Sequence, residues 1–150
     1  MKKISKIFII SLISLLFIGA VSATTDIDSL KAPNGFKEIK NGTSTLEKDG
    51  QKWEFYIDKY SEWESLYKEN KTNLTTKNIG DTLYYFEYAG DASENYPATA
   101  GVVEKVKIGD TEYVAYILKE GKNLTNSEQE FCKDGVLSFN TANNLKPTPV

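Results

Sequence analysis

The sequence lacks histidine and arginine altogether, because all 18 of its basic residues are lysines, and it contains one cysteine, Cys132. Without histidine, the chain has no Ser/His/Asp or Cys/His catalytic arrangement and lacks the commonest zinc ligand. Without arginine, it lacks bidentate clamps for phosphate or carboxylate and the usual guanine-reading contact. One cysteine cannot form an intramolecular disulfide, so we expect Cys132 to be a small buried core residue.

The sequence offers no clear metal or cofactor motif. Asp91–Asn95 opens like a calcium-binding loop, with oxygen-bearing side chains at alternating positions. The sixth position is Tyr96 instead of glycine, and the twelfth is Val102 instead of a bidentate acid, which excludes an EF-hand. A polar interstrand loop is the favoured interpretation and a looser oxygen site the alternative. We predict no metal, no cofactor and no catalytic residue.

The N-terminus has the pattern of a secretory signal peptide. Three lysines within the first six residues precede an apolar run over residues 7–20, and small residues follow it. This pattern predicts a signal peptide over residues 1–23, cleaved between Ala23 and Thr24. The alternative is an uncleaved membrane anchor over residues 7–23, because roughly 17 residues are the lower limit for spanning a bilayer.

The part of the chain that export would deliver is acidic. With three of the 18 lysines in the signal segment, residues 24–150 keep 15 lysines against 21 acidic residues, a formal net charge of -6. An acidic chain without a basic cluster argues against binding to nucleic acid or to anionic lipid. We predict a single secreted or cell-surface domain over residues 24–150. Its expected partner is an extracellular polymer, ligand or protein, and it would contact a membrane only through an uncleaved N-terminus.

Two hairpins stand out in the exported part. Each pairs two stretches of alternating or apolar residues around a dipeptide that favours the positive φ of a tight turn. The first pairs residues 43–47 with 52–58 around Asp49-Gly50, and the second pairs residues 98–108 with 112–119 around Gly109-Asp110.

Two helices are also predicted. The capping box Ser61–Glu64 begins a helix of about nine residues with an apolar face. A second helix covers residues 126–144, with Asn126 or Ser127 as its N-cap and acidic residues in its first turn.

The segment between the first helix and the second hairpin completes the fold prediction. Residues 70–81 are polar and predict a loop, whereas the aromatic stretch 82–88 predicts a strand. The order of elements predicts an α+β domain, with an antiparallel sheet of about five strands and two helices packed on one of its faces.

Several short segments resemble those of small exported proteins of methanogenic archaea whose function is unassigned. The segments are Leu30–Phe36, Gly101–Glu104, Phe139-Asn140 and Asn143–Pro147. The resemblance covers most of the chain and implies export. It implies no catalytic residues.

Four Asn-x-Ser/Thr motifs predict possible N-glycosylation of an exported chain, since each provides the acceptor that the modification requires. Their acceptors are Asn41, Asn70, Asn73 and Asn123. We favour Asn70 and Asn73 because their loop is the most polar. The alternative is that a chain rich in asparagine and threonine contains such motifs by chance.

Tyr84, Phe86 and Tyr88 share one face of the strand over residues 82–88. If that face is exposed, its rings can stack on sugars or anchor a protein partner. The alternative is that helices cover the rings or that the tyrosines only expose their hydroxyls.

Carboxylates are the remaining candidates for chemistry. Glu54 and Asp58 share one strand face with Tyr56 between them. Glycoside hydrolysis needs two carboxyl groups about 5 to 9 Å apart, although charges on an outward strand face are mostly solvated. We therefore predict an exported, non-catalytic binding or interaction domain of the cell envelope or its surroundings. The alternative is a small carboxylate-dependent secreted hydrolase.

Overall fold

The computed structural model describes residues 26–69 and 73–149. The predicted signal peptide, its cleavage site at Ala23 and Thr24, and Asn70 lie outside the described residues. Within them, seven strands form one antiparallel sheet in the order β1-β2-β6-β5-β4-β3, with β7 paired to β5. The strands are β1 (Thr43–Lys48), β2 (Gln51–Lys59), β3 (Leu74–Asn78), β4 (Leu83–Tyr88), β5 (Thr99–Ile108), β6 (Thr111–Glu120) and β7 (Lys146–Pro147). The helices are α2 (Tyr60–Glu69) and α3 (Asn126–Asn143), with 3₁₀ turns at Ile27–Ser29 and Ala92–Glu94.

The broad α+β prediction is confirmed, but the prediction of about five strands is wrong. The two additional strands are short: β3 lies within the predicted loop 70–81, and β7 has two residues. β3 is an edge strand in which only Leu74 is buried. Because a strand with one buried residue shows no apolar alternation, its sequence looks like that of a polar loop.

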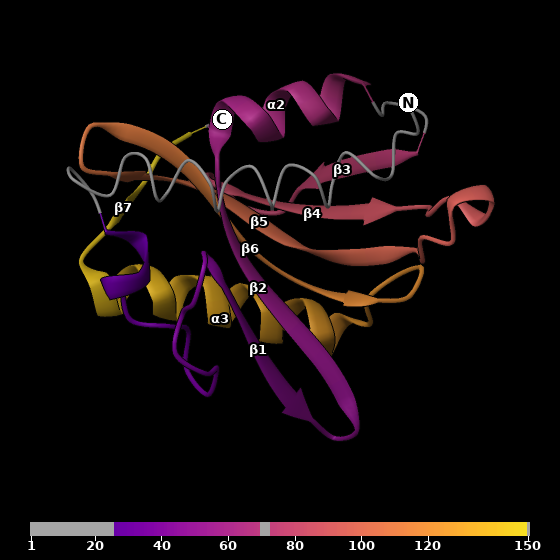
Figure 1. Ribbon diagram of the computed structural model, residues 1–150, viewed down its shortest axis with the longest axis horizontal. Helices are drawn as coiled ribbons and strands as arrows, with labels where there is room; N and C mark the ends of the chain where they lie inside the picture. The colour runs from indigo at the N-terminus through magenta and orange to yellow at the C-terminus, as the bar shows by residue number, and fades with distance from the viewer. Residues whose placement is uncertain (1–25, 70–72, 150) are drawn as a thin grey trace.

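The two helices lie on opposite faces of the sheet, so the prediction of one covered face is also wrong (Figure 1). α2 connects β2 to β3, and three strands, β6, β5 and β4, lie between these two in the sheet. The chain therefore has to pass over one face to reach β3. α3 follows β6 and packs against β5 and β6 from the other side. The result is a three-layer arrangement of helix, sheet and helix.

The central strands carry the sequence signature of a sheet that is covered on both sides. All six residues from Tyr113 to Leu118 in β6 are buried, and Ala100–Glu104 in β5 is buried as well. Unbroken buried runs of this kind are expected where both faces are covered, whereas a one-sided sheet shows alternation. In the sequence, the unbroken apolar and aromatic run Tyr113–Leu118 was the signal from which the second covered face was predictable.

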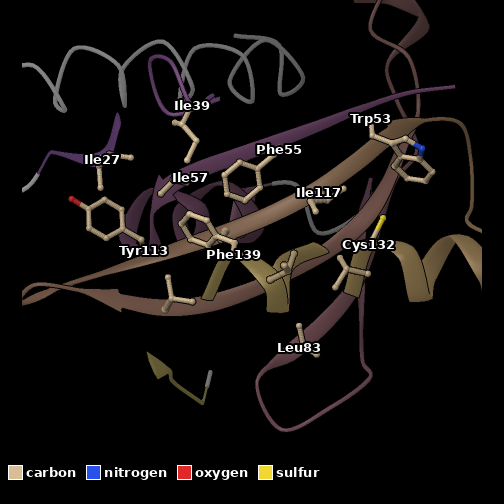
Figure 2. Close-up of a cluster of buried hydrophobic side chains, with 14 of the residues drawn as sticks. Ile27, Ile39, Trp53, Phe55, Ile57, Leu83, Tyr113, Ile117, Cys132 and Phe139 are labelled. Atoms are coloured by element: carbon tan, nitrogen blue, oxygen red, sulfur yellow. The ribbon is translucent and has the colours of Figure 1, made fainter. Parts of the chain in front are cut away.

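The main core lies between the sheet and α3 (Figure 2). Phe55 of β2 and Phe139 of α3 meet with their ring centroids 4.9 Å apart, and Trp53 lies 4.8 Å from Phe131. Cys132 is fully buried in this core, as predicted. Burial also raises the pKa of its thiol, with Glu128 adding to the effect. We conclude that Cys132 serves packing and is a poor nucleophile.

Both predicted hairpins are confirmed. Asp49 and Gly50 have φ of 53° and 77°, and Gly109 has φ of 63°, which are the positive values that such turns require. The predicted second helix is also confirmed, but its N-cap is Thr125 and not Asn126 or Ser127. Thr125 accepts a hydrogen bond from the backbone N–H of Glu128, whose carboxylate accepts one in return. This capping box was readable from Thr125 and Glu128.

Candidate functional site

Partly exposed aromatic side chains gather on the face of the sheet that α2 covers. They surround a smaller core that includes buried Phe86, Tyr88 and Tyr116. We call the half-buried members the α2-side aromatic cluster: Tyr56, Tyr60, Trp63, Tyr84 and Tyr96. They come from β2, α2, β4 and the segment before β5, so the tertiary structure alone brings them together.

The predicted aromatic face of β4 exists, but its exposure differs among its three rings. Tyr84, Phe86 and Tyr88 do lie on one face and belong to the same cluster. Phe86 is only 3% exposed and Tyr88 only 1%, so neither is available to bind a sugar or a partner at the surface. Tyr84 is half-buried and remains available. For Phe86 and Tyr88 the alternative interpretation holds, because α2 and its neighbours cover both rings.

Trp63 of α2 organises the centre of this face. Its indole ring lies 5.5 Å from the ring of Phe86 and 5.1 Å from that of Tyr116. Tyr116 in turn stacks on Tyr56 with centroids 5.2 Å apart and an interplanar angle of 17°. Such ring pairs hold the cluster in one arrangement.

The predicted carboxylate pair, Glu54 and Asp58, lies on this face, but each carboxylate is bound to a different tyrosine. The Tyr56 hydroxyl donates to Glu54 at 2.8 Å, and the Tyr116 hydroxyl donates to Asp58 at 2.5 Å. Burial, reinforced by Glu54, raises the pKa of Tyr56, so its hydroxyl remains a donor. Asp58 is 3% exposed.

The two carboxylates do not converge. Glu54 and Asp58 are four residues apart on one strand, which separates their Cα atoms by about 13 Å. Tyr56 and Tyr116 face each other on the antiparallel strands β2 and β6. The Tyr56 hydroxyl donates to Glu54, two residues before Tyr56 on β2, whereas the Tyr116 hydroxyl donates to Asp58, two residues after Tyr56. Each carboxylate is therefore held by its own tyrosine.

Lysine and acidic side chains border the aromatic cluster. Lys105 of β5 forms an ion pair with Glu112 at 3.2 Å and lies 4.1 Å from the ring centroid of Tyr60. The Tyr60 hydroxyl donates to Glu64 at 3.3 Å. Burial followed by the nearby Glu64 raises the pKa of Tyr60. These contacts fix the ring of Tyr60 at the edge of the cluster.

A hollow of about 380 Å³ lies at one end of the sheet, where β3 begins beside the end of β4. We call it the sheet-end pocket. It is lined by Asn73, Thr75, Glu87, Tyr88, Ala89 and Lys122. Thr75 and Glu87 face each other across β3 and β4, and the Ala89 N–H donates to the Asn73 carbonyl at 2.8 Å. The sequence pointed to Asn73 but not to Glu87 or Lys122, because residues so far apart in the chain carry no common motif.

Glu87 is held in place on its inner side. The Tyr85 hydroxyl donates to Glu87 Oε2 and accepts a hydrogen bond from the Leu124 N–H at 3.1 Å. Burial first, and then the hydrogen bond to Glu87, raise the pKa of Tyr85 to about 12, so the hydroxyl keeps its proton. The other oxygen, Glu87 Oε1, receives no hydrogen bond from the described residues.

The described glycosylation candidates differ in their surroundings. Asn41 and Asn123 are exposed, Asn41 in a turn with φ of 56°. Asn73 is half-buried and lines the sheet-end pocket.

The side chain of Asp91, which opens the polar loop Asp91–Asn95, makes hydrogen bonds within that loop. Asp91 Oδ1 accepts from the Ser93 N–H at 3.0 Å and from the Ser93 hydroxyl at 2.5 Å, which caps the 3₁₀ turn that follows. Over residues 26–69 and 73–149, no cluster of three or more acidic or cysteine side chains is arranged to hold a metal ion.

None of the helices in the described part of the chain is long and apolar enough to cross a membrane. Comparison with family models, curated proteins and solved structures finds no match to this chain.

Proposed function

We propose that this protein is an exported, non-catalytic binding domain of the cell envelope or its surroundings, and that the α2-side aromatic cluster contacts its partner. The N-terminal pattern and the resemblance to small exported proteins of methanogenic archaea support export. The half-buried rings of the cluster support a role in binding. Aromatic side chains that keep part of their surface exposed are enriched at contact surfaces because they bury much area at little entropic cost.

The arrangement of the carboxylates favours binding over hydrolysis. A glycoside hydrolase needs two carboxyl groups within reach of one bond. Glu54 and Asp58 instead accept hydrogen bonds from two different tyrosines on a packed face. The single observation that carries the proposal is that partly exposed rings cluster where the acids do not converge.

Export predicts a processed N-terminus. The intact mass of the native protein, recovered separately from culture fluid and from cell envelopes, is expected to correspond to a chain that begins at Thr24. Removal of the signal segment accounts for this mass, because signal peptidase cleaves after a small residue such as Ala23. A full-length chain found only in membranes would contradict cleavage and make the protein a tethered domain.

Binding through the aromatic cluster predicts that loss of its accessible rings weakens retention. The full chain is expected to co-sediment with washed cell-envelope fragments of the source cells. Replacing both Tyr84 and Tyr96 with alanine is expected to weaken this association about tenfold or more, since aromatic anchors commonly contribute that much.

The matched control is Phe36→Ala, which removes a half-buried ring packed against the opposite face. Circular dichroism and thermal melting establish that each variant is folded. Equal retention of the double tyrosine variant and the wild-type protein would show that this cluster is not the contact surface.

A further inference from the structure

One glycosylation motif coincides with the sheet-end pocket. Asn73 and Thr75, the acceptor and the hydroxyl residue of one motif, both line the hollow. Asn73 also makes no side-chain hydrogen bond to any described residue, so none of these residues engages its amide nitrogen. The place where a sugar would be attached is therefore also a place with room for it.

We propose that Asn73 carries an N-linked glycan whose first sugar lies in the sheet-end pocket, with Glu87 and Lys122 as its polar contacts. This inference rests on the proposed export, because only an exported chain meets the enzymes that add such a sugar. The sheet-end pocket would then hold a covalently attached sugar instead of a free ligand.

The chemistry of the pocket fits a sugar ring. Sugar hydroxyls both donate and accept hydrogen bonds, and the walls provide a carboxylate oxygen at Glu87, an ammonium group at Lys122 and a hydroxyl at Thr75. The volume of about 380 Å³ falls within the range of small-molecule sites. Glu87 needs no rearrangement, because the Tyr85 hydroxyl, which accepts from the Leu124 N–H, already binds Oε2 while Oε1 remains available.

The attachment step uses an activated sugar on a lipid phosphate as its co-reactant. The Asn73 side-chain nitrogen forms a bond to the anomeric carbon of that sugar and loses one proton. The bond between the anomeric carbon and the phosphate oxygen breaks, and the lipid phosphate leaves with the electron pair. No oxidation or reduction takes place.

Asn73 differs in its surroundings from the two other acceptors that the structure describes. Asn41 and Asn123 are exposed, and neither lines the hollow. A sugar on either would extend into solvent. A sugar on Asn73 would be ordered by the fold and would in turn stabilise it, since a ligand that binds only the folded state favours that state.

The test compares the full chain made in a host that glycosylates exported proteins with the same chain made in one that does not. Glycopeptide mapping is expected to find sugar on Asn73. Asn73→Gln is expected to lower the melting temperature by about 3 °C in the first host and to have little effect in the second. Glu87→Gln and Lys122→Gln are each expected to reduce the difference in melting temperature between the two preparations.

The controls use the motif itself and the exposed acceptors. Thr75→Ser keeps the motif and is expected to keep the sugar, whereas Thr75→Ala is expected to abolish it. Asn123→Gln is expected to leave the melting temperature unchanged in either host, and Asn41→Gln to lower it equally in both, because its φ of 56° favours asparagine over glutamine. A sugar on Asn73 whose removal changes the difference in melting temperature between the hosts no more than these two variants do would overturn the proposed packing.

The failure of this inference is distinguishable from the failure of the proposed function. A chain that begins at Thr24 but carries no sugar on Asn73 would overturn the glycan and leave export intact. A chain that retains residues 1–23, remains inside the cell and carries no sugar would overturn both.

Discussion

Replacing Gly101 with alanine is expected to lower the free energy of unfolding by about 3 kcal/mol. Gly101 lies in β5 between Phe86 of β4 and Leu118 of β6. A Cβ added there would lie 2.1 Å from the carbonyl oxygen of Ile117 and 2.9 Å from the Cα of Leu118. Both are backbone atoms of a central strand, so the clash is relieved only by moving the strand and its hydrogen bonds. Removing the conformational freedom of glycine from the unfolded chain offsets about 1 kcal/mol at most.

Urea unfolding followed by tryptophan fluorescence measures this loss, because Trp53 and Trp63 report on the two cores. Gly80→Ala is the matched control. A Cβ at Gly80 would make only ordinary contacts of 3.6 Å with Leu83, so a change within about 0.5 kcal/mol is expected. Equal stabilities of the two alanine variants would contradict the close approach of β5 and β6 at Gly101.

Replacing Glu104 with glutamine is expected to stabilise the protein above about pH 5, by about 1 kcal/mol or more at neutral pH. Glu104 is 1% exposed and points from β5 towards α3. Thr82 donates a hydrogen bond to its carboxyl group at 2.7 Å, and the Asn140 side-chain amide donates another. No cation of the described residues pairs with it. Burial raises the pKa of Glu104, and the two hydrogen bonds lower it only in part.

Because burial raises the pKa of Glu104, the direction in which stability changes with pH is fixed. The folded protein keeps the Glu104 proton to a higher pH than the unfolded chain, whose carboxyl titrates near 4.5. Between those two pKa values folding takes up a proton, so wild-type stability falls as the pH rises. Glutamine cannot ionise, yet it can accept from Thr82 and pair with the Asn140 amide, whose Oδ1 is buried without a partner in the structure.

Chemical unfolding of both proteins between pH 4 and pH 8 provides the test. The stability difference between the glutamine variant and the wild type is expected to be small near pH 4 and to grow with pH. Glu128 changes stability in the opposite direction, because its hydrogen bond to Lys119 lowers its pKa, but it is present in both proteins and cancels from the difference. A difference that stays constant across this range would show that folding does not raise the pKa of Glu104.

Local sequence patterns predicted those elements whose geometry depends on neighbouring residues. The turns at Asp49-Gly50 and Gly109-Asp110 depend on backbone preferences within two residues, and the hairpins were predicted with nearly their observed bounds. The strand β4 and the helix α3 were predicted for the same reason. Alternation alone predicted that Tyr84, Phe86 and Tyr88 share one face of their strand.

The candidate site was predictable only in part. Alternation indicates which residues share a face, but it does not indicate what covers that face. α2 and its neighbours bury Phe86 and Tyr88 and leave Tyr84 accessible, which depends on the path of α2 over the sheet. The separation of Glu54 and Asp58 by Tyr56 and Tyr116 likewise depends on the pairing of β2 with β6.

The sequence by itself determined that the chain has no histidine or arginine chemistry, carries a signal-like N-terminus and forms hairpins and a capped helix, because composition and local preferences decide these properties. Only the tertiary structure decided that the helices take opposite faces and that β3 completes the edge of the sheet. It alone brings Asn73, Glu87 and Lys122 to one pocket. These features arise from contacts between residues distant in the chain, and the packing of the whole sheet selects such contacts.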